Sequence, residues 1–478
     1  MNVPSPIFLL FAAVAAIVFN LGRSVNWRQA VLLVVNLLFL ASFSTSLLTF
    51  VPFAGFICLG YAAYRLTTTG RQASRLFVVL LVLVLAAFVW LKRYSFVPSV
   101  TFLPFPYLLV GLSYVFFRVM HVLIDGHQGS IEGRIGPVSY LNYTLNFTSL
   151  VSGPIQFYQP YHRMEMERLP LDLPIIGRAI ERIVIGYFKV TIVSVLLSMA
   201  QHGAISGLLS GGVLTERVSA GVLVAAIYPV YLYFNFSGYV DVVIGVARFF
   251  RLELPENFDR PFSAENFINF WSRWHMTLSG WLKTYVYNPL MMAGMTRVTS
   301  PSLAPYIAVL VFFITFFLVG LWHGQTTEFL FYGFLQGGGI AGNKLYQIQM
   351  ANWLGKKGYR ALAANRLYRA CCRGLTFTWF TLTLFWFWSS WSQIGEFYRS
   401  LGLTASVLVG VVILAASILV LEALEMLRAL VLAVRWREIP VVTSRYTRTV
   451  WGTALFVVTF GAIVLLNAPA PDIVYKAF

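Results

Sequence analysis

The chain has 478 residues, of which 58% are hydrophobic and only 11% are charged. Soluble domains carry about 25% charged residues, so this composition, with a mean hydropathy of +0.74, excludes an ordinary soluble protein. The 35 Lys and Arg outnumber the 18 Asp and Glu, but they lie in short loops rather than on one face, as in the cytoplasmic loops of membrane proteins. We therefore predict a protein embedded in the lipid bilayer, with no nucleic-acid partner.

Apolar runs of membrane-spanning length recur along the chain. A helix needs about 17 to 25 mostly apolar residues to cross the hydrocarbon core. Comparable runs occupy Leu76 to Leu91, Leu303 to Leu321, Gly402 to Leu421 and Val450 to Leu466. About 11 to 13 such runs, some of them short, can be counted. The sequence predicts an all-α, multi-pass membrane protein, and its three cysteines indicate neither a disulfide framework nor a metal site.

Two regions before residue 250 depart from plain membrane spans. Ser149 to Pro174 is rich in Pro, Gly and charge, so we expect it to leave the membrane or to lie at its surface. In the stretch "YLYFNFSGYVD", Ser237 and Asp241 interrupt an apolar span. An unpaired carboxylate in a span is costly. Asp241 is therefore expected either to face a polar passage or to form a structural ion pair with Arg248 or Arg273.

The segment from Leu254 to Leu290 is too polar to span a membrane. Ser263 is the predicted helix start. Aromatic and apolar residues then recur at three- and four-residue intervals, which predicts an interfacial or re-entrant helix with one apolar face. These residues are Trp271, Trp274, His275, Leu278, Trp281 and Leu282. His275 is then either a polar tip at the membrane interface or a functional imidazole.

His323 lies in the apolar stretch "LVGLWHGQ". Ionisable residues inside a membrane are costly and are functional candidates by default. We expect Gly320 and Gly324 to clear space around the ring, and Trp322 to stack beside a substrate. Removal from water disfavours the charged imidazole, and the neutral ring can accept a proton as a general base. The alternative is a structural histidine bonded to a carbonyl group.

Small residues follow His323 at four-residue steps. Gly333, Gly337 and Ala341 form one such series, and Gly338 and Gly342 form another. Small residues at this spacing let neighbouring helix backbones approach closely. The helix that bears His323 is therefore expected to pack inside protein rather than to face lipid.

The other four histidines lie near loops or charges. We predict that all of them are ordinary surface residues: His121, His127, His162 and His202.

Several motifs together resemble one known family. The stretch "PENFDRPFSAENFINFWSRWHMTLSGWLKTYVYNPL" is followed, 48 residues after His275, by His323 in "GLWHG". With "FSGYVDVVIGVARFFRLELPENF" and "SGPI" upstream, this order resembles the membrane-bound O-acyltransferase (MBOAT) family over about residues 105–345. Within the family the chain resembles bacterial polymer-modifying members: the alginate O-acetyltransferase membrane subunit and the D-alanyl transferase of teichoic acids.

The resemblance implies a multi-helix bundle with re-entrant or interfacial helices around a central tunnel. The chain is then a single integral membrane domain over residues 1–478, with additional C-terminal membrane helices over about residues 370–467. It also implies an enzyme of the bacterial cytoplasmic membrane. Such an enzyme moves an acyl group, acetyl in the first instance, from a cytoplasmic thioester to hydroxyls of an exported polysaccharide or cell-surface polymer.

By the same resemblance His323 is the catalytic histidine and His275 is the upstream histidine of the "RWH" motif. We assign substrate contacts to Trp271, Trp274, Ser237, Asp241 and Trp322. No resident cofactor is expected. The implied partners are acetyl-coenzyme A or an acyl carrier protein on the cytoplasmic side, and extracytoplasmic proteins that accept or relay the acyl group.

Three alternatives stay open on the sequence. The enzyme can be a D-alanyl transferase for teichoic-acid-like polymers, because "SGPI" and "GLSYVFFRVMHVLIDGHQGSI" resemble that branch, whereas "PENF" and "SGYVD" resemble the alginate branch. The polar groups can instead form the permeation path of a transporter. A scaffold for surface-polymer assembly is the third alternative, and it predicts that both His275 and His323 tolerate substitution.

Overall fold

The computed structural model describes residues 3–68, 73–298, 300–433 and 444–466. Within these ranges the chain is helical, and the only extended pairing is an isolated bridge between Phe258 and Trp274. The predicted all-α class is therefore confirmed. Residues 434–443 and residue 467 of the predicted C-terminal helices lie outside the described residues.

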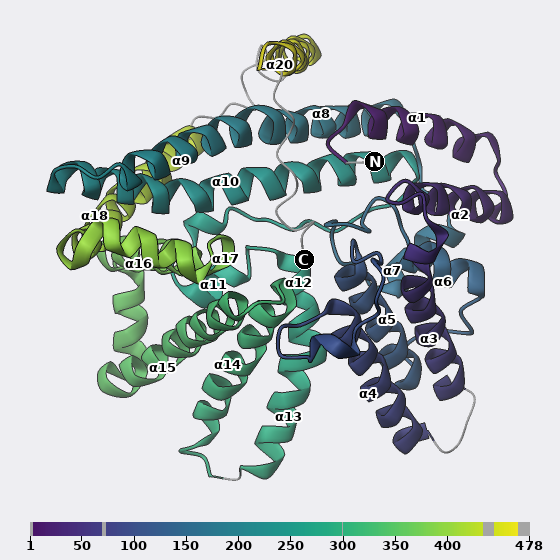
Figure 1. Cartoon of the computed structure of the whole chain (residues 1–478), viewed down its shortest axis with the longest axis horizontal. Coiled ribbons are helices and arrows are strands. Elements are labelled where there is room, and N and C mark those ends of the chain that lie inside the picture. Colours follow the sequence, from purple (N-terminus) through teal and green to yellow (C-terminus); the bar gives the residue numbers. More distant parts are fainter. Residues whose placement is uncertain (1–2, 69–72, 299, 434–443, 467–478) are drawn as a thin grey trace. The chain divides into compact units, whose positions relative to one another are not determined.

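The described chain divides into two compact units (Figure 1). The first unit runs to Thr191 and includes Asn235–Glu256, and the second contains Ile192–Phe234 and the chain from Asn257 onwards. The first unit holds α1 (Pro6–Leu21), α2 (Val25–Ala41), α3 (Val51–Thr68), α4 (Ala73–Lys92), α5 (Leu112–His127), α6 (Pro137–Thr144), α7 (Tyr158–Met166) and α8 (Leu173–Phe188). Helix α10 (Leu214–Phe249) contributes to both units. The prediction of a single integral domain stays a prediction.

The second unit is built mostly from the C-terminal half of the chain. Its helices are α9 (Ser194–Leu209), α11 (Phe267–Trp271), α12 (Met276–Leu282), α13 (Asn288–Arg297), α14 (Ala304–His323), α15 (Thr327–Ala364), α16 (Arg366–Thr383), α17 (Phe385–Trp388), α18 (Trp391–Ala433) and α20 (Arg445–Leu466). Helices α15 and α18 each bend at a glycine with positive φ, Gly355 and Gly402. A positive φ is strained for other residues, so glycine permits these two bends.

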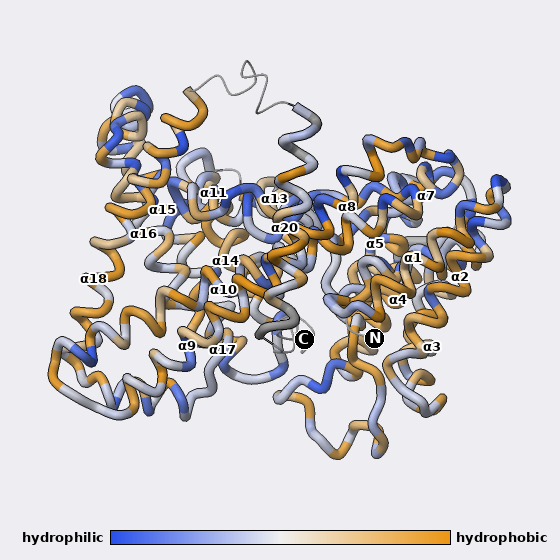
Figure 2. The backbone as a smooth tube through the Cα atoms, turned by 90° about the horizontal axis from the view of Figure 1, so that it is seen from above, coloured by the Kyte–Doolittle hydropathy of each residue, from blue (hydrophilic) through white to orange (hydrophobic). Residues whose placement is uncertain are grey.

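Six helical segments of the described chain are long and apolar enough to cross a membrane. They are Leu47–Thr68, Arg75–Lys92, Leu173–Leu209, Leu214–Phe249, Ala304–His323 and Trp391–Ala433. Three shorter apolar helices accompany them: Pro6–Leu21, Val25–Ala41 and Thr449–Ala462. Hydrophobic residues, drawn in orange, recur along the helices of each unit (Figure 2). By length and composition the chain is therefore a multi-pass membrane protein.

Glycines bring α14 and α15 into close contact. A methyl group added at Gly333 would lie 2.5 Å from the carbonyl oxygen of Phe317, and one at Gly337 would lie 2.6 Å from that of Phe313. These distances are shorter than van der Waals contact, so only glycine fits. The predicted close approach between the His323 helix and a neighbouring helix is confirmed, and Figure 1 shows α14 and α15 beside each other.

The first unit has a polar core. Residues 149–156 are buried, in contrast to the expectation that this segment lies at the surface. Arg118, which is also buried, explains the difference: its guanidinium donates hydrogen bonds to the carbonyl oxygens of Thr144 and Ser149, each at 2.7 Å. A buried cation that satisfies backbone carbonyls lets a polar loop fold into the protein interior.

Candidate active site

His323 is the last residue of α14, and its side chain is buried. Its ring centre lies 4.7 Å from that of Trp322, 5.0 Å from that of Phe387 and 6.0 Å from that of Tyr332. Each of these ring pairs meets edge to face. The imidazole is therefore held by aromatic rings from α14, α15 and α17, which restrict its orientation.

The glycines next to His323 serve helix packing, not substrate space. A methyl group at Gly320 would overlap the backbone of Gly333, and one at Gly324 would overlap the ring of Phe329. The expectation that these glycines clear room around the imidazole is therefore wrong. Their absent side chains let α15 approach the end of α14 closely enough to enclose His323.

The segment that bears His275 is not one continuous helix. Helix α11 ends at Trp271, and α12 begins at Met276, with His275 between them at φ 45° and ψ 53°. This left-handed conformation is uncommon for a residue other than glycine and breaks the helix. The predicted start at Ser263 is also wrong, because Asn266 caps α11 by accepting a hydrogen bond from the Asn269 amide at 2.8 Å.

The predicted apolar face is nevertheless buried. All six residues are at most 5% exposed: Trp271, Trp274, His275, Leu278, Trp281 and Leu282. Trp274 stacks on Phe270 with ring centres 5.7 Å apart, and Trp271 lies 5.0 Å from Phe316 of α14. The two tryptophans therefore anchor the short helices to the second unit rather than facing lipid.

Asn257 of the "PENF" motif fixes the His275 ring. Its side-chain oxygen lies 3.2 Å from Nδ1 of His275 and accepts hydrogen bonds from the amide and hydroxyl of Thr277 at 3.1 and 2.9 Å. Because the Thr277 amide can only donate, the Asn257 atom must be the oxygen, and Nδ1 of His275 must carry the proton. The lone pair of the neutral ring is then on Nε2.

Burial lowers the pKa of His275 well below its usual value. His275 lies outside the candidate membrane spans and stays neutral at physiological pH. A neutral imidazole with a fixed tautomer can accept a hydrogen bond or a proton at one defined nitrogen.

Trp322 links the two histidines. Its ring centre lies 5.9 Å from that of His275 and 4.7 Å from that of His323, with an edge-to-face arrangement in both cases. Residues 48 positions apart in sequence therefore contact the same indole within one unit. The arrangement places two imidazoles around one aromatic side chain in a buried environment. Electrostatic interactions between charges or dipoles are stronger in such an environment than in water.

Ser237 and Asp241 belong to the first unit. Asp241 accepts a hydrogen bond from Nε of Arg182 at 3.0 Å and from Nζ of Lys189 at 2.6 Å. The predicted partners are wrong: Arg248 pairs with Glu253, and Arg273 lies 3.9 Å from Asp259. The ion pair with α8 satisfies the Asp241 carboxylate, and Ser237 is buried nearby on α10.

One further histidine is buried, although its sequence context predicted a surface location. His121 on α5 is 1% exposed, and its Nε2 accepts a hydrogen bond from the Tyr158 amide at 2.8 Å. Its Nδ1 lies 3.6 Å from Asp125. The available signal was Asp125, four residues after His121, because residues at this spacing face each other on a helix. The prediction of a surface location holds for His202, which is exposed.

Comparison with known proteins identifies the family of the chain. The model of the membrane-bound O-acyltransferase family matches residues 30–387. The chain belongs to this family. It is 26% identical over 226 residues to a teichoic acid D-alanyltransferase of Bacillus subtilis, covering 47% of this chain and 56% of that protein.

Two other relatives are named for different activities. A probable alginate O-acetylase of Azotobacter vinelandii is 27% identical over 245 residues, covering 51% of this chain and 46% of the relative. A peptidoglycan O-acetyltransferase of Helicobacter pylori is 41% identical over 119 residues, covering 25% and 21% respectively. The chain spans about half the length of the first two relatives.

Proposed function

We propose that this protein is an O-acyltransferase that acylates hydroxyl groups of an exported polysaccharide or another cell-surface polymer. The supporting observation is that His275 and His323 both contact Trp322 in a buried aromatic site. The three relatives described above are named for transfer of an acyl group to teichoic acid, alginate or peptidoglycan. We propose acetyl as the acyl group and the bacterial cytoplasmic membrane as the location.

The chemistry requires a base, charge stabilisation and exclusion of water. The acceptor oxygen attacks the thioester carbonyl carbon, a C–O bond forms, and the C–S bond breaks. His323 accepts the hydroxyl proton and returns it to the leaving thiolate. His275 orients the donor or acceptor through its Nε2 lone pair, with Asn257 holding its ring. A thioester needs no further activation, so the burial of both histidines is consistent with protection from hydrolysis.

The remaining assignments extend this proposal. Trp271, Trp274 and Trp322 contact substrate, and Ser237 and Asp241 line the passage of the acceptor or donor. The donor is acetyl-coenzyme A or an acyl carrier protein on the cytoplasmic side. Extracytoplasmic proteins receive or relay the acyl group to the polysaccharide. A central tunnel between the two faces of the membrane is part of the same proposal.

D-alanyl transfer to teichoic-acid-like polymers is the second candidate. It is favoured by the D-alanyltransferase of Bacillus subtilis and by that of Streptococcus thermophilus, which is 28% identical over 259 residues. The same base and the same thioester chemistry serve both reactions, because both products are esters of a polymer hydroxyl. The acyl group and the acceptor polymer separate the two candidates.

Chemical analysis of surface polymers tests the proposal. Mild base releases ester-linked acyl groups, and we expect ester-linked acetate in cells with the gene and its loss in cells that lack it. Loss of ester-linked D-alanine instead would establish the second candidate. Unchanged polymer esters would contradict both, and solute flux in vesicles without any acyl donor would then favour a transporter.

A further inference from the structure

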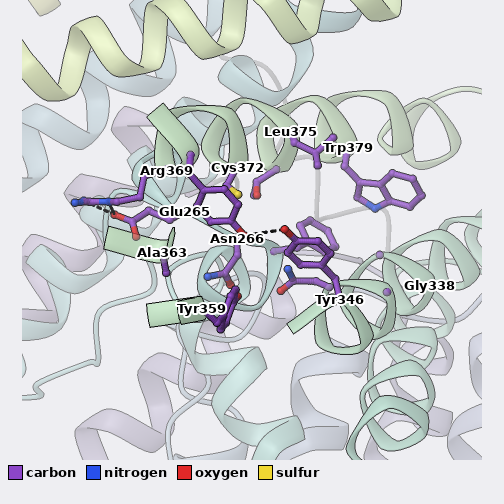
Figure 3. Close-up of a pocket in the computed structure, with 16 residues that line it drawn as sticks. Glu265, Asn266, Gly338, Tyr346, Tyr359, Ala363, Arg369, Cys372, Leu375 and Trp379 are labelled. Atoms are coloured by element: carbon purple, nitrogen blue, oxygen red, sulfur yellow. Dashed lines mark hydrogen bonds and ion pairs between the residues drawn. The ribbon is translucent and has the colours of Figure 1, made fainter. Parts of the chain in front are cut away.

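The second unit contains a cavity of about 530 Å³, lined by residues of α15 and α16 and by residues 265–267 at the start of α11 (Figure 3). Most of its walls are aromatic or small side chains. The aromatic side chains are Phe267, Tyr346, Tyr359, Tyr368 and Trp379. A volume of this size is typical of a binding site for a small molecule or one lipid chain.

The glycines of α15 explain why the space exists. Gly333 and Gly337 lie on the face that packs against α14. Gly338 and Gly342 line the cavity, and a methyl group at either position would meet no atom within 4 Å. The second glycine series predicted from the sequence therefore does not pack against a helix. It leaves open space along α15.

Two pairs of polar side chains that line the cavity bond to each other. The Tyr368 hydroxyl donates to that of Tyr346 at 3.1 Å, and Nε of Arg369 donates to Glu265 at 2.7 Å (Figure 3). The ion pair that lines the cavity contributes no net charge. The interior therefore suits hydrocarbon better than a nucleotide, whose phosphates need several cations at close range.

Cations lie next to the cavity on the same helix. After the bend at Gly355, Lys356, Tyr359, Arg360 and Ala363 follow the spacing of one helical face. Tyr359 and Ala363 line the cavity, so the exposed Lys356 and Arg360 border its edge. The segment from residue 344 to residue 373 has seven Lys and Arg and no acidic residue.

Exposed apolar side chains flank these cations. Trp353 is 79% exposed and Leu367 is 71% exposed. Tryptophan, lysine and arginine side by side are typical of a helix at the headgroup level of a bilayer, where anionic lipids attract basic segments. The surroundings of the cavity thus match a lipid with an anionic headgroup.

We infer that the cavity between α15 and α16 binds an anionic phospholipid, with an acyl chain along Gly338 and Gly342 and the phosphate next to Lys356 and Arg360. This lipid site is separate from the histidine pair and does not depend on the proposed acyl transfer. The occupant is a membrane phospholipid, because the apolar interior of the cavity matches its acyl chain and the basic edge matches its phosphate.

Native mass spectrometry of the purified full chain in detergent tests the inference, with phosphatidylglycerol or phosphatidylcholine added at equal concentration. We expect the wild type to retain more phosphatidylglycerol than phosphatidylcholine. Gly342→Leu places a side chain in the cavity and should lower retention of phosphatidylglycerol at least about fivefold. Gly342→Ala leaves most of the cavity open, and this variant should still retain phosphatidylglycerol. Gly410→Leu is the matched control, because a methyl group there also meets no atom within 4 Å.

The double variant Lys356→Gln with Arg360→Gln tests whether these two cations bind the lipid phosphate. Each basic residue near the membrane surface contributes about 1 kcal/mol to binding of anionic lipid, so the preference over phosphatidylcholine should fall about tenfold or more. Arg297→Gln with Arg399→Gln, two exposed cations elsewhere in the second unit, should leave the preference unchanged. Unaltered retention in Gly342→Leu, equal retention of both lipids by the wild type, or displacement of phosphatidylglycerol by coenzyme A would overturn the inference.

Discussion

The two units both bury histidines, but they surround them differently. In the first unit, His121 accepts a backbone hydrogen bond from Tyr158 and its ring stacks on Phe157 with centres 5.1 Å apart. Its other nitrogen faces Asp125. In the second unit, His275 and His323 meet at the indole of Trp322. A histidine bonded to the backbone holds the fold together, whereas two imidazoles at one aromatic ring can serve a reaction. Burial alone does not distinguish the two cases.

The largest effect is expected from His323→Ala. Loss of a general base lowers turnover by about 10²- to 10⁴-fold, and we expect a loss of about 10³-fold in acyl transfer per folded molecule in proteoliposomes. His121→Ala should instead lower thermal stability while folded molecules keep their turnover. Exposed His202→Ala is the control and should change neither property. Equal turnover losses in His323→Ala and His121→Ala would contradict the assignment of a structural role to His121 and a catalytic role to His323.

Asn257 sharpens the comparison, because it positions His275 without contacting the reacting atoms. Asn257→Ala removes the acceptor of Nδ1, and misplacement of a catalytic group costs about 100-fold in rate. We expect the loss in kcat rather than in KM. Asn257→Asp restores an oxygen acceptor and should recover part of the rate.

The pH profile distinguishes positioning from a general loss of structure. The carboxylate introduced by Asn257→Asp should raise the pKa of His275, because a negative charge beside the ring favours its charged form. Activity of the Asn257→Asp variant should therefore fall as pH is lowered, over a range where the wild type is constant. An identical profile for the variant and the wild type would argue against contact between this side chain and a functional imidazole.

Packing of α14 on α15 is the next test. A methyl group in Gly320→Ala overlaps the Gly333 backbone, and overpacking costs about 1 to 3 kcal/mol. We expect a lower unfolding temperature and lower activity, because this contact encloses His323. Gly338→Ala enters open space on the other face of α15 and should be neutral or slightly stabilising. Equal melting temperatures for the two variants would contradict the packing described here.

The smallest effect is a pH dependence of stability. Burial lowers the pKa of both His121 and His275 in the folded state. The unfolded chain then binds more protons below about pH 6.5, so stability falls as pH is lowered, by about 1.4 kcal/mol per pH unit for each histidine. His275→Gln should make the decline in unfolding temperature between pH 7 and pH 5 shallower. His202→Gln should leave it unchanged, and an equally steep decline in His275→Gln would show that His275 titrates normally.

Local patterns predicted part of the fold and of the site. The glycine spacing after His323 correctly indicated a close helix contact, because that contact depends only on small residues along one helical face. The three- and four-residue spacing that includes Trp271 and Trp274 correctly grouped these residues on one face. It predicted an interfacial or re-entrant helix, however, and not the buried segment with a break at His275 that the structure shows.

Other features depend on long-range contacts and could not be predicted. Asp241 pairs with Arg182 and Lys189, 59 and 52 residues away, whereas the sequence pattern suggested Arg248 or Arg273. The turn at His275 has a positive φ without a glycine to signal it. It is held by Asn257, whose backbone oxygen accepts a hydrogen bond from the Met276 amide at 2.9 Å. Tertiary contacts decide such positions, and a helical periodicity cannot reveal them.

His275 and His323 are proposed to act as one catalytic centre around Trp322. A double-mutant cycle on acyl transfer tests it most directly, with turnover measured for His275→Ala, His323→Ala and the double variant in the same proteoliposomes. Residues that act as a unit are not additive, so we predict that the double variant is no more than about tenfold slower than His323→Ala. Losses that multiply, or full turnover in His323→Ala, would contradict the account.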